Sequence, residues 1–411
     1  MVGLLGTLAL VALTTAFTRL DRRLWGSAAT PGVLLLGGYT AIAIVVSLAG
    51  LWFEFDDVSL LTYGVILALG LLSMSVSVLA AAFLRWRPTE LVLPVQHDGR
   101  RARMVLLTLV VTYVPLAAYT AIGQGGLWSS EAAESLSSGV LGHMHVALAL
   151  ATIWYAISNR DGSALRIAIL IGAFGGLSLY PVKGWTLVPL AAVVIASFIR
   201  SRRGWSTIAY PVSLLALATL LFFGIYLSRV DWDSSNPELV SASVSLVFEH
   251  MIFYLTAGFM GLNAIVHGLR LHGGLDTIFA PFVNFVQMLQ GGERPVTVIS
   301  DVYVQGMTDQ GQGGNVYSFV GTLVGYTAPG IGLAFAGLFV AIGYVILGCA
   351  WRTGASVLRA AAVYGTAVFA FGWFEYYFWH LTPLEILLLA LLCSLPSLAK
   401  RRRPECPTTL K

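Results

Sequence analysis

Charged residues are scarce in this chain. Only 11% of the 411 residues are Asp, Glu, Lys or Arg, whereas 57% are apolar, and the mean hydropathy is +0.81. This charge content is too low for the surface of a water-soluble protein, so an ordinary soluble enzyme is excluded. Long uncharged stretches occur instead, and most reach or approach the roughly 20 residues that a helix needs to cross a bilayer. They predict an all-α polytopic membrane protein with about 11 transmembrane helices.

The uncharged stretches are Met1–Thr18, Leu24–Phe53, Val58–Leu84, Met104–Ser130, Ser135–Asn159, Ile167–Val182, Gly184–Ile199, Gly204–Ser228, Gln310–Trp351, Ala360–Phe374 and Ile386–Ala399.

Cysteine is almost absent as well. Cys349, Cys393 and Cys406 show no CxxC spacing, and none falls in a predicted outer connection. This pattern indicates neither a disulfide framework nor a zinc site, and we expect no cofactor. The N-terminus starts apolar and has neither a basic leader nor a small-residue cleavage site before Arg19, so we interpret it as a first span and not as a removed signal peptide.

Basic residues are missing from alternate connections between the predicted spans. One set of connections holds 20 of the 24 Lys and Arg residues, and the other set holds 15 of the 20 acidic residues. Because basic loops stay on the cytoplasmic side, this asymmetry predicts a cytoplasmic-membrane protein with its N-terminus outside and its C-terminus inside. The net charge of +4 resides in these membrane-edge loops, so we expect no nucleic-acid partner. The basic residues on the outer side are Lys183, Arg229, Arg270 and Arg294.

Three of these four residues lie in or beside one long outer segment, 229–315, which we interpret as an extracytoplasmic cap within a single membrane domain, 1–411. Its stretch Ser241–Leu275 is apolar enough to cross, but a crossing would invert every later connection. We therefore expect helices in or dipping into the outer interface. We expect a second such helix at Leu275–Leu289, with its amide and aromatic residues facing a cavity.

A polar, glycine-rich stretch, Gln305–Gly332, follows this segment. Glycine lets backbone N–H groups approach an anion closely, and the apolar helix that follows would hold such a loop at the membrane surface. A flexible linker followed by a re-entrant turn explains the same composition equally well.

Short patterns with a defined order carry a resemblance. Asn315-Val316-Tyr317 is followed by a half-length apolar run that closes on Gly330 and Gly332, and Tyr254–Val266 is an upstream aromatic and glycine stretch. Lys183 opens a span in "YPVKGWTLVPL". Over roughly the second half of the chain, this spacing and topology resemble the Wzy-type O-antigen polymerase family, the oligosaccharide repeat-unit polymerases related to O-antigen ligases.

The resemblance implies a metal-independent glycosyltransferase that acts at the outer face of the membrane. Such an enzyme transfers the growing chain from its polyprenyl pyrophosphate carrier to a new lipid-linked repeat unit. The implied partners are the lipid-linked oligosaccharide as donor and acceptor, membrane lipids, a chain-length regulator and a flippase. Tyr254, Asn315 and Tyr317 are the substrate-binding residues that lie within the matching motifs.

The outer cations suit this reaction. Breaking the anomeric C–O bond leaves charge on a pyrophosphate, which fixed cations can stabilise without a metal. Arg is well suited because its planar guanidinium binds phosphate oxygens through two N–H groups. We therefore predict that Lys183, Arg229, Arg270 and Arg294 hold the pyrophosphate. Arg229 and Arg294 also stand beside acidic residues with which they could pair, and Arg270 could simply extend along apolar surface to water.

The reaction also needs a base for the proton of the acceptor hydroxyl. O-antigen ligases have a histidine directly before the asparagine of the matching motif, where this chain has Gly314, so the ligase assignment is weakened. Glu375 lies in a short outer turn whose aromatic residues could stack on sugars, and His250 shares a helical face with Tyr254 by i, i+4 spacing. Our first candidates are Glu375, Asp309 and His250, and the others are Glu249, His267, His272, Asp301 and His380.

Two alternatives from other classes stay open. Glu54–Asp57 is similar to the acidic motif of metal-dependent GT-C glycosyltransferases, although the predicted N-terminus-out topology opposes that match. A polytopic transporter is the main non-enzyme alternative. Transporters usually place ionisable residues or broken helices near the bilayer midplane, whereas the informative residues of this chain gather in outer connections.

Overall fold

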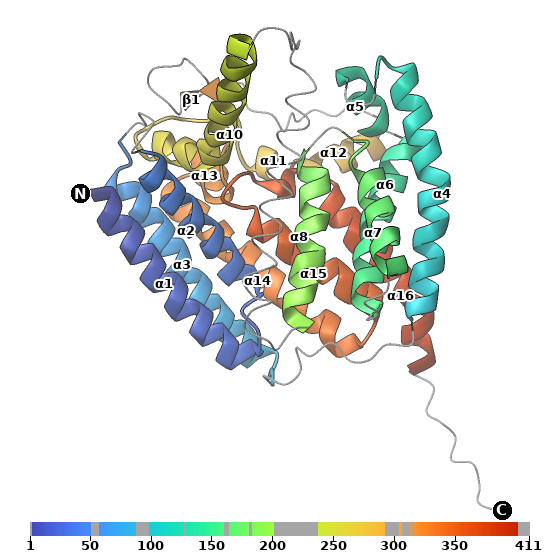
Figure 1. Ribbon diagram of the computed structural model, residues 1–411. Helices are drawn as coiled ribbons and strands as arrows, with labels where there is room; N and C mark the ends of the chain where they lie inside the picture. The colour runs from blue at the N-terminus through green and yellow to red at the C-terminus, as the bar shows by residue number, and fades with distance from the viewer. Residues whose placement is uncertain are drawn as a thin grey trace, which may run out of the picture. The chain divides into compact units, whose positions relative to one another are not determined.

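The computed structural model describes residues 2–50, 57–87, 98–126, 129–137, 139–159, 164–180, 183–200, 237–291, 304–305, 313–314 and 316–401. Figure 1 shows the helices in chain order: α1 Val2–Trp25, α2 Pro31–Ala49, α3 Leu60–Phe83, α4 Gly99–Gly123, α5 Ser130–Ser137, α6 Gly139–Ser158, α7 Ala164–Leu177, α8 Lys183–Arg200, α10 Pro237–Val266, α11 Leu275–Ile278, α12 Ala280–Leu289, α13 Phe319–Gly325, α14 Pro329–Thr353, α15 Ser356–Ala370, the 3-10 helix η1 Tyr377–Trp379 and α16 Thr382–Arg401. Two short strands, β1 Val304–Gln305 and β2 Gly313–Gly314, pair antiparallel.

The helices confirm an all-α polytopic membrane protein. Seven of the described helices are long and apolar enough to span a membrane, and four shorter helices are also apolar. Ten of the eleven predicted stretches overlap a described helix, while Gly204–Ser228 lies outside the described residues. The long apolar helices are Gly3–Trp25, Pro31–Leu48, Leu60–Phe83, Gly99–Gly123, Gly139–Ser158, Val240–Val266 and Pro329–Thr353, and the shorter ones are Ala164–Leu177, Gly184–Ser197, Ser356–Ala370 and Thr382–Leu395.

The chain divides into two compact units. Unit 1 comprises residues 1–89, 201–345 and 366–381, and unit 2 comprises residues 90–200, 346–365 and 382–411.

In unit 1, α1, α2 and α3 lie side by side (Figure 1). Small hydroxyl side chains join them, because Thr14 bonds Thr40 at 2.7 Å and Thr7 bonds Ser47 at 3.0 Å. Local sequence sets the helix starts. Pro31 occupies the first turn of α2, and the Ser59 hydroxyl accepts a hydrogen bond from the Thr62 N–H at the start of α3.

In unit 2, α6 packs against α4, α7, α8 and α16. The His145 ring of α6 is buried between aromatic residues, with its Nδ1 atom 3.0 Å from the Tyr113 hydroxyl. Ser356 is a second junction: its hydroxyl donates to Asp98 at 2.8 Å and accepts from the Trp154 indole at 2.7 Å. His145 and Ser356 thus each bond a side chain on another segment of this unit.

Helix α10 differs from the predicted series of interfacial helices. It runs without a break for 30 residues, and its stretch Val240–Val266 is long and apolar enough to span a membrane. After Pro237 it contains no proline that could interrupt the helix, and Gly258 and Gly261 are buried in packing contacts that compensate for their low helix propensity.

The expected helix at Leu275–Leu289 is present but breaks at Phe279 into α11 and α12. The expectation that its aromatic residues face a cavity is wrong, because Phe282 and Phe285 are exposed. Asn284 and Gln287 are partly buried, as is Val283. A membrane protein meets lipid at its surface, so aromatic residues can be directed outward there.

Asp21 is a buried acidic residue whose role the sequence did not indicate. It lies among the basic residues at the end of α1, yet it is 0% exposed. Its carboxylate accepts hydrogen bonds from hydroxyls of three further segments, each at 2.5 Å: Thr30 before α2, Ser77 in α3 and Tyr344 in α14. One carboxylate therefore joins four parts of unit 1, and its hydrogen bonds offset the cost of burying it.

Asp21→Ala should lower the stability of unit 1 strongly, because three buried hydroxyls lose their acceptor together. We expect a loss of roughly 2–5 kcal/mol, compared with about 1–2 kcal/mol for Tyr344→Phe, which removes one hydroxyl with its hydrogen bonds to Asp21 and Thr30. The apparent Tm of each purified variant in detergent measures the difference. It is the temperature at which half of the monodisperse elution peak is lost after heating. Equal Tm values for the two variants would contradict this role.

Candidate functional site

The turn 371–381, between α15 and α16, is the centre of the candidate site in unit 1. Buried aromatic residues hold it. The Phe378 ring lies 4.9 Å from that of Phe339 in α14, and the Tyr376 hydroxyl donates to the carbonyl oxygen of Ile278 in α11 at 3.2 Å. Burial raises the pKa of the Tyr376 phenol. The expectation that the aromatic residues stack on sugars does not suit Phe374, Tyr376, Tyr377 and Trp379, which are buried.

The backbone of the turn is also fixed by hydrogen bonds. The Gly372 carbonyl oxygen accepts the Phe319 N–H at 2.6 Å and the Tyr39 hydroxyl at 3.2 Å. The same hydroxyl accepts the Val320 N–H at 3.1 Å. The first N–H groups of α13, which have no partner within their own helix, are thereby satisfied by the turn and by α2.

Helix α10 lies directly on this turn because it has glycine at the contact. A Cβ atom at Gly258 would overlap the carbonyl oxygens of Trp373 and Phe374. One turn further along, a Cβ at Gly261 would lie 2.9 Å from the Tyr317 ring. Any side chain at Gly258 would therefore force α10 away from the turn.

This contact brings two predicted site residues to the turn. The rings of His250 and Tyr254 lie 6.0 Å apart, which confirms that they share a face of α10. The Tyr254 ring lies 5.0 Å from that of Phe374, the residue before Glu375. Two of the three first candidates for the base, His250 and Glu375, are thus connected through adjoining aromatic rings.

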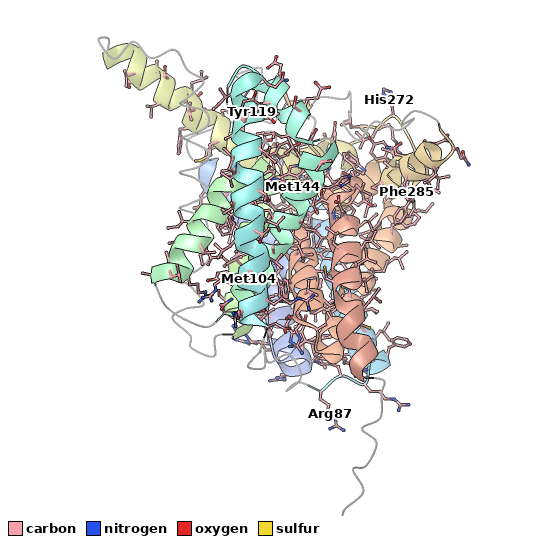
Figure 2. The ribbon with its side chains drawn as sticks, turned by 90° about the vertical axis from the view of Figure 1, so that its right-hand side faces the viewer. Arg87, Met104, Tyr119, Met144, His272 and Phe285 are labelled. Carbon is pink, nitrogen blue, oxygen red and sulfur yellow. The ribbon has the colours of Figure 1, made fainter. Side chains whose placement is uncertain are left out.

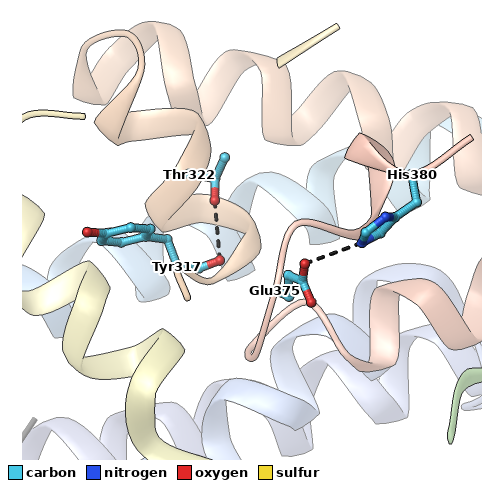
Figure 3. Close-up of polar contacts among 4 residues, drawn as sticks. All are labelled: Tyr317, Thr322, Glu375 and His380. Atoms are coloured by element: carbon cyan, nitrogen blue, oxygen red, sulfur yellow. Dashed lines mark hydrogen bonds and ion pairs between the residues drawn. The ribbon is translucent and has the colours of Figure 1, made fainter. Parts of the chain in front are cut away.

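Glu375 and His380 form a pair at the surface of the turn (Figure 3). The Oε1 atom of Glu375 lies 3.3 Å from Nε2 of His380, and each side chain is 26% exposed. Both are therefore partly accessible, while their backbone is held by the buried aromatic residues around them. A carboxylate in this arrangement can accept a proton on its second oxygen while the imidazole N–H holds the first.

Tyr317 is buried, whereas a substrate-binding residue has to be accessible at the surface. Its side chain is 1% exposed, and Figure 3 shows its ring extending away from Glu375 and His380. Its carbonyl oxygen accepts a hydrogen bond from the Thr322 hydroxyl at 3.2 Å. Tyr317 thus packs beneath α10 and supports the start of α13.

Two of the four predicted cations are among the described residues. Arg270 is exposed in the loop after α10, beside Leu271, which is buried against Gly325 of α13. Lys183 is the first residue of α8 and belongs to unit 2. The remaining predicted residues lie outside the described residues, namely Arg229, Arg294, Asp301, Asp309 and Asn315.

Other candidates for the base have local roles. Glu249 accepts a hydrogen bond from Ser245 at 3.3 Å, one turn earlier in α10. His267 donates from Nδ1 to the Asn263 carbonyl oxygen at 2.8 Å and so closes the end of the helix. His272 is exposed in the loop that follows.

Asn263 is a structural residue that sequence reasoning missed. Its side chain is buried, accepts from the Ser59 N–H and the Thr62 hydroxyl, and donates to the Asp57 carbonyl oxygen, at 2.7 to 3.1 Å. An amide in the uncharged second half of α10 was the available signal. It fixes the end of α10 to the start of α3, which in turn fixes the height of Gly258 on the turn.

Unit 2 contains a second His–Glu pair. Nδ1 of His143 in α6 lies 2.7 Å from Oε1 of Glu385 in α16, and the His143 side chain is 67% exposed. No local sequence pattern indicates this pair, because its two residues lie far apart in the sequence. Among the residues that the structure describes, no group of three or more His, Cys, Asp or Glu residues could hold a metal ion.

Residues 82–403 match the model of a family of unknown function (DUF6337). The match runs from the end of α3 beyond the end of α16 and includes α10 and the turn 371–381. Neither a curated protein nor a solved structure matches the chain.

Proposed function

The chain belongs to the family of unknown function (DUF6337), and from its own residues we propose that it is a metal-independent, membrane-embedded glycosyltransferase. It polymerises polyprenyl-pyrophosphate-linked oligosaccharide repeat units at the outer face of the cytoplasmic membrane, with its N-terminus outside and its C-terminus inside. Lipid-linked oligosaccharide is both donor and acceptor, and a flippase and a chain-length regulator are its partners.

The Glu375–His380 pair is the observation that carries this proposal. An acid–base residue must be accessible to substrate and yet held in one geometry. Both side chains are 26% exposed, whereas the aromatic residues around them are buried. The turn also lies at the start of α16, an apolar helix, so the pair belongs at a membrane surface where a lipid-linked substrate presents its sugars.

In the proposed reaction, the acceptor hydroxyl attacks the anomeric carbon of the donor. A new C–O bond forms, the bond between the anomeric carbon and the phosphate oxygen breaks, and its electron pair remains on the pyrophosphate. Glu375 takes the hydroxyl proton on Oε2, while the Nε2–H of His380 holds Oε1. Arg270 supports the departing pyrophosphate, because an exposed guanidinium can donate two N–H bonds to phosphate oxygens.

The other predicted site residues also have proposed roles. His250 and Tyr254 line the α10 side of the turn, where they contact the acceptor sugars. Lys183, Arg229, Arg294 and Asn315 are proposed to bind substrate, and Asp309 is a further candidate for proton transfer.

A polytopic transporter is the second candidate, and Asp21 is the observation that favours it. Ionisable residues inside spans often mark ion pathways. The carboxylate of Asp21, however, is engaged by three hydroxyls from three segments, which gives it a structural role in the bundle.

Purified protein in vesicles should extend lipid-linked repeat units into a ladder of products without nucleotide sugar or added divalent metal. The ladder should persist in EDTA, because cationic side chains stabilise the leaving group. Gel separation of the released oligosaccharides measures it. Products that never exceed one added unit, or activity abolished by chelation, would refute the proposal.

Substitutions in the turn should separate the base from the residue that positions it. Glu375→Gln should lower kcat by about 10²–10⁴-fold, because the amide cannot accept the proton. His380→Ala should also lower kcat, with KM little changed. His380→Gln should restore much of the rate, because its amide N–H can replace the Nε2–H.

The matched controls for these substitutions are His143→Ala and Glu385→Gln, which disrupt the His–Glu pair of unit 2. We expect near-normal polymerisation from both. A normal rate for Glu375→Gln, or equal losses in the Glu375 and Glu385 variants, would remove Glu375 from the mechanism.

A further inference from the structure

Helix α12 exposes a continuous row of large apolar side chains. Phe282, Phe285, Val286 and Leu289 follow i, i+3, i+4 and i+7 spacing and are 54%, 47%, 49% and 70% exposed. Figure 2 shows Phe285 on the outward side of this helix. Val283, Asn284 and Gln287 are partly buried, and Ala280 and Pro281 are buried. The exposed row is unfavourable in water, because it leaves four large apolar side chains in contact with solvent.

The packing of α12 places this apolar face at the level of the bilayer. Phe279, which joins α11 to α12, has its ring 5.7 Å from that of Phe335 and 6.3 Å from that of Phe339. Both belong to α14, a candidate span that begins at Pro329. At 1.5 Å per residue, they lie about 9 and 15 Å along this helix.

The length of α14 sets the depth. Its 25 residues extend over about 37 Å, whereas the hydrocarbon core is about 30 Å thick. For an α14 that crosses upright and centred on the bilayer, Phe335 and Phe339 lie within the hydrocarbon, about 5 and 11 Å from its nearer boundary. Ile331 and Leu338 on α14 are exposed as well, so the apolar face of α12 continues a surface that faces lipid.

We propose that α12 is embedded in the leaflet at which α14 begins, with Phe282, Phe285, Val286 and Leu289 against the acyl chains of membrane lipids. The loop before α11 carries exposed Arg270 and His272, which then lie near the phosphate headgroups. The embedded helix contacts η1, so it fixes the turn with Glu375 and His380 in the same leaflet. This inference rests on the membrane fold and does not require the glycosyltransferase activity.

Site-directed spin labelling tests the proposal on the full chain. Cys349, Cys393 and Cys406 are replaced by Ala or Ser, and single cysteines are introduced by Phe282→Cys, Phe285→Cys, Val286→Cys and Leu289→Cys. The protein is reconstituted in vesicles of phosphatidylethanolamine and phosphatidylglycerol. Collision of each label with oxygen, which is enriched in hydrocarbon, is compared with its collision with a water-soluble nickel complex.

Two matched positions calibrate the measurement. Leu71→Cys lies on an exposed face of α3, in the middle of a candidate span, and His272→Cys lies in an exposed loop. The four α12 labels should collide with oxygen several times more often than with nickel, as at position 71, and position 272 should show the reverse.

Nickel-dominated collisions on α12 would place the helix in water and overturn the proposal. Low collision rates with both reagents would overturn it too, because they would mean that a second copy of the chain or another segment covers the face. Since the four labels replace half-exposed side chains, each is expected to leave the fold intact, and a monodisperse elution profile together with an unchanged helical circular dichroism spectrum checks this.

Discussion

The contact between α10 and the turn 371–381 is the constraint on which the candidate site depends. It exists because Gly258 lets the backbone of α10 touch the carbonyl oxygens of Trp373 and Phe374. Asn263 fixes α10 lengthwise against the start of α3, and Tyr39 and α13 fix the other side of the turn. The turn is therefore held from two directions while its two polar side chains remain accessible.

Two buried polar residues of unit 1 differ clearly from the Glu375–His380 pair. Asp21 and Asn263 are buried, and each is engaged by three hydrogen bonds from other segments. Such groups stabilise the bundle because their loss would leave several partners unsatisfied. Glu375 and His380 differ, since they are partly exposed and pair with each other. This contrast, together with an apolar surface that suits lipid, favours chemistry on a membrane-bound substrate.

Composition and charge patterning were sufficient to predict the fold class, because a span requires a long apolar run wherever the helices pack. The spacing of His250 and Tyr254 also predicted their shared face. The pairing of Glu375 with His380 and the burial of Asp21 among basic neighbours depend on turns and helix contacts that no local pattern encodes. The continuity of α10 was missed because the charge asymmetry of the connections argued against a crossing in this stretch, and charge asymmetry carries no information on helix length. The outward aromatic face of α12 was missed because its aromatic residues were expected to face a cavity. We propose instead that they face lipid.

Mapping of substrate contacts tests the central claim, that the turn of unit 1 receives a lipid pyrophosphate substrate. A polyprenyl-pyrophosphate oligosaccharide with a photoreactive group on its first sugar would be cross-linked to the protein in vesicles, and the adducts would be located by mass spectrometry. The account predicts adducts between Phe371 and His380 and in the loop around Arg270, suppressed by excess unlabelled substrate. Adducts confined to unit 2, or adducts that unlabelled substrate does not suppress, would contradict it.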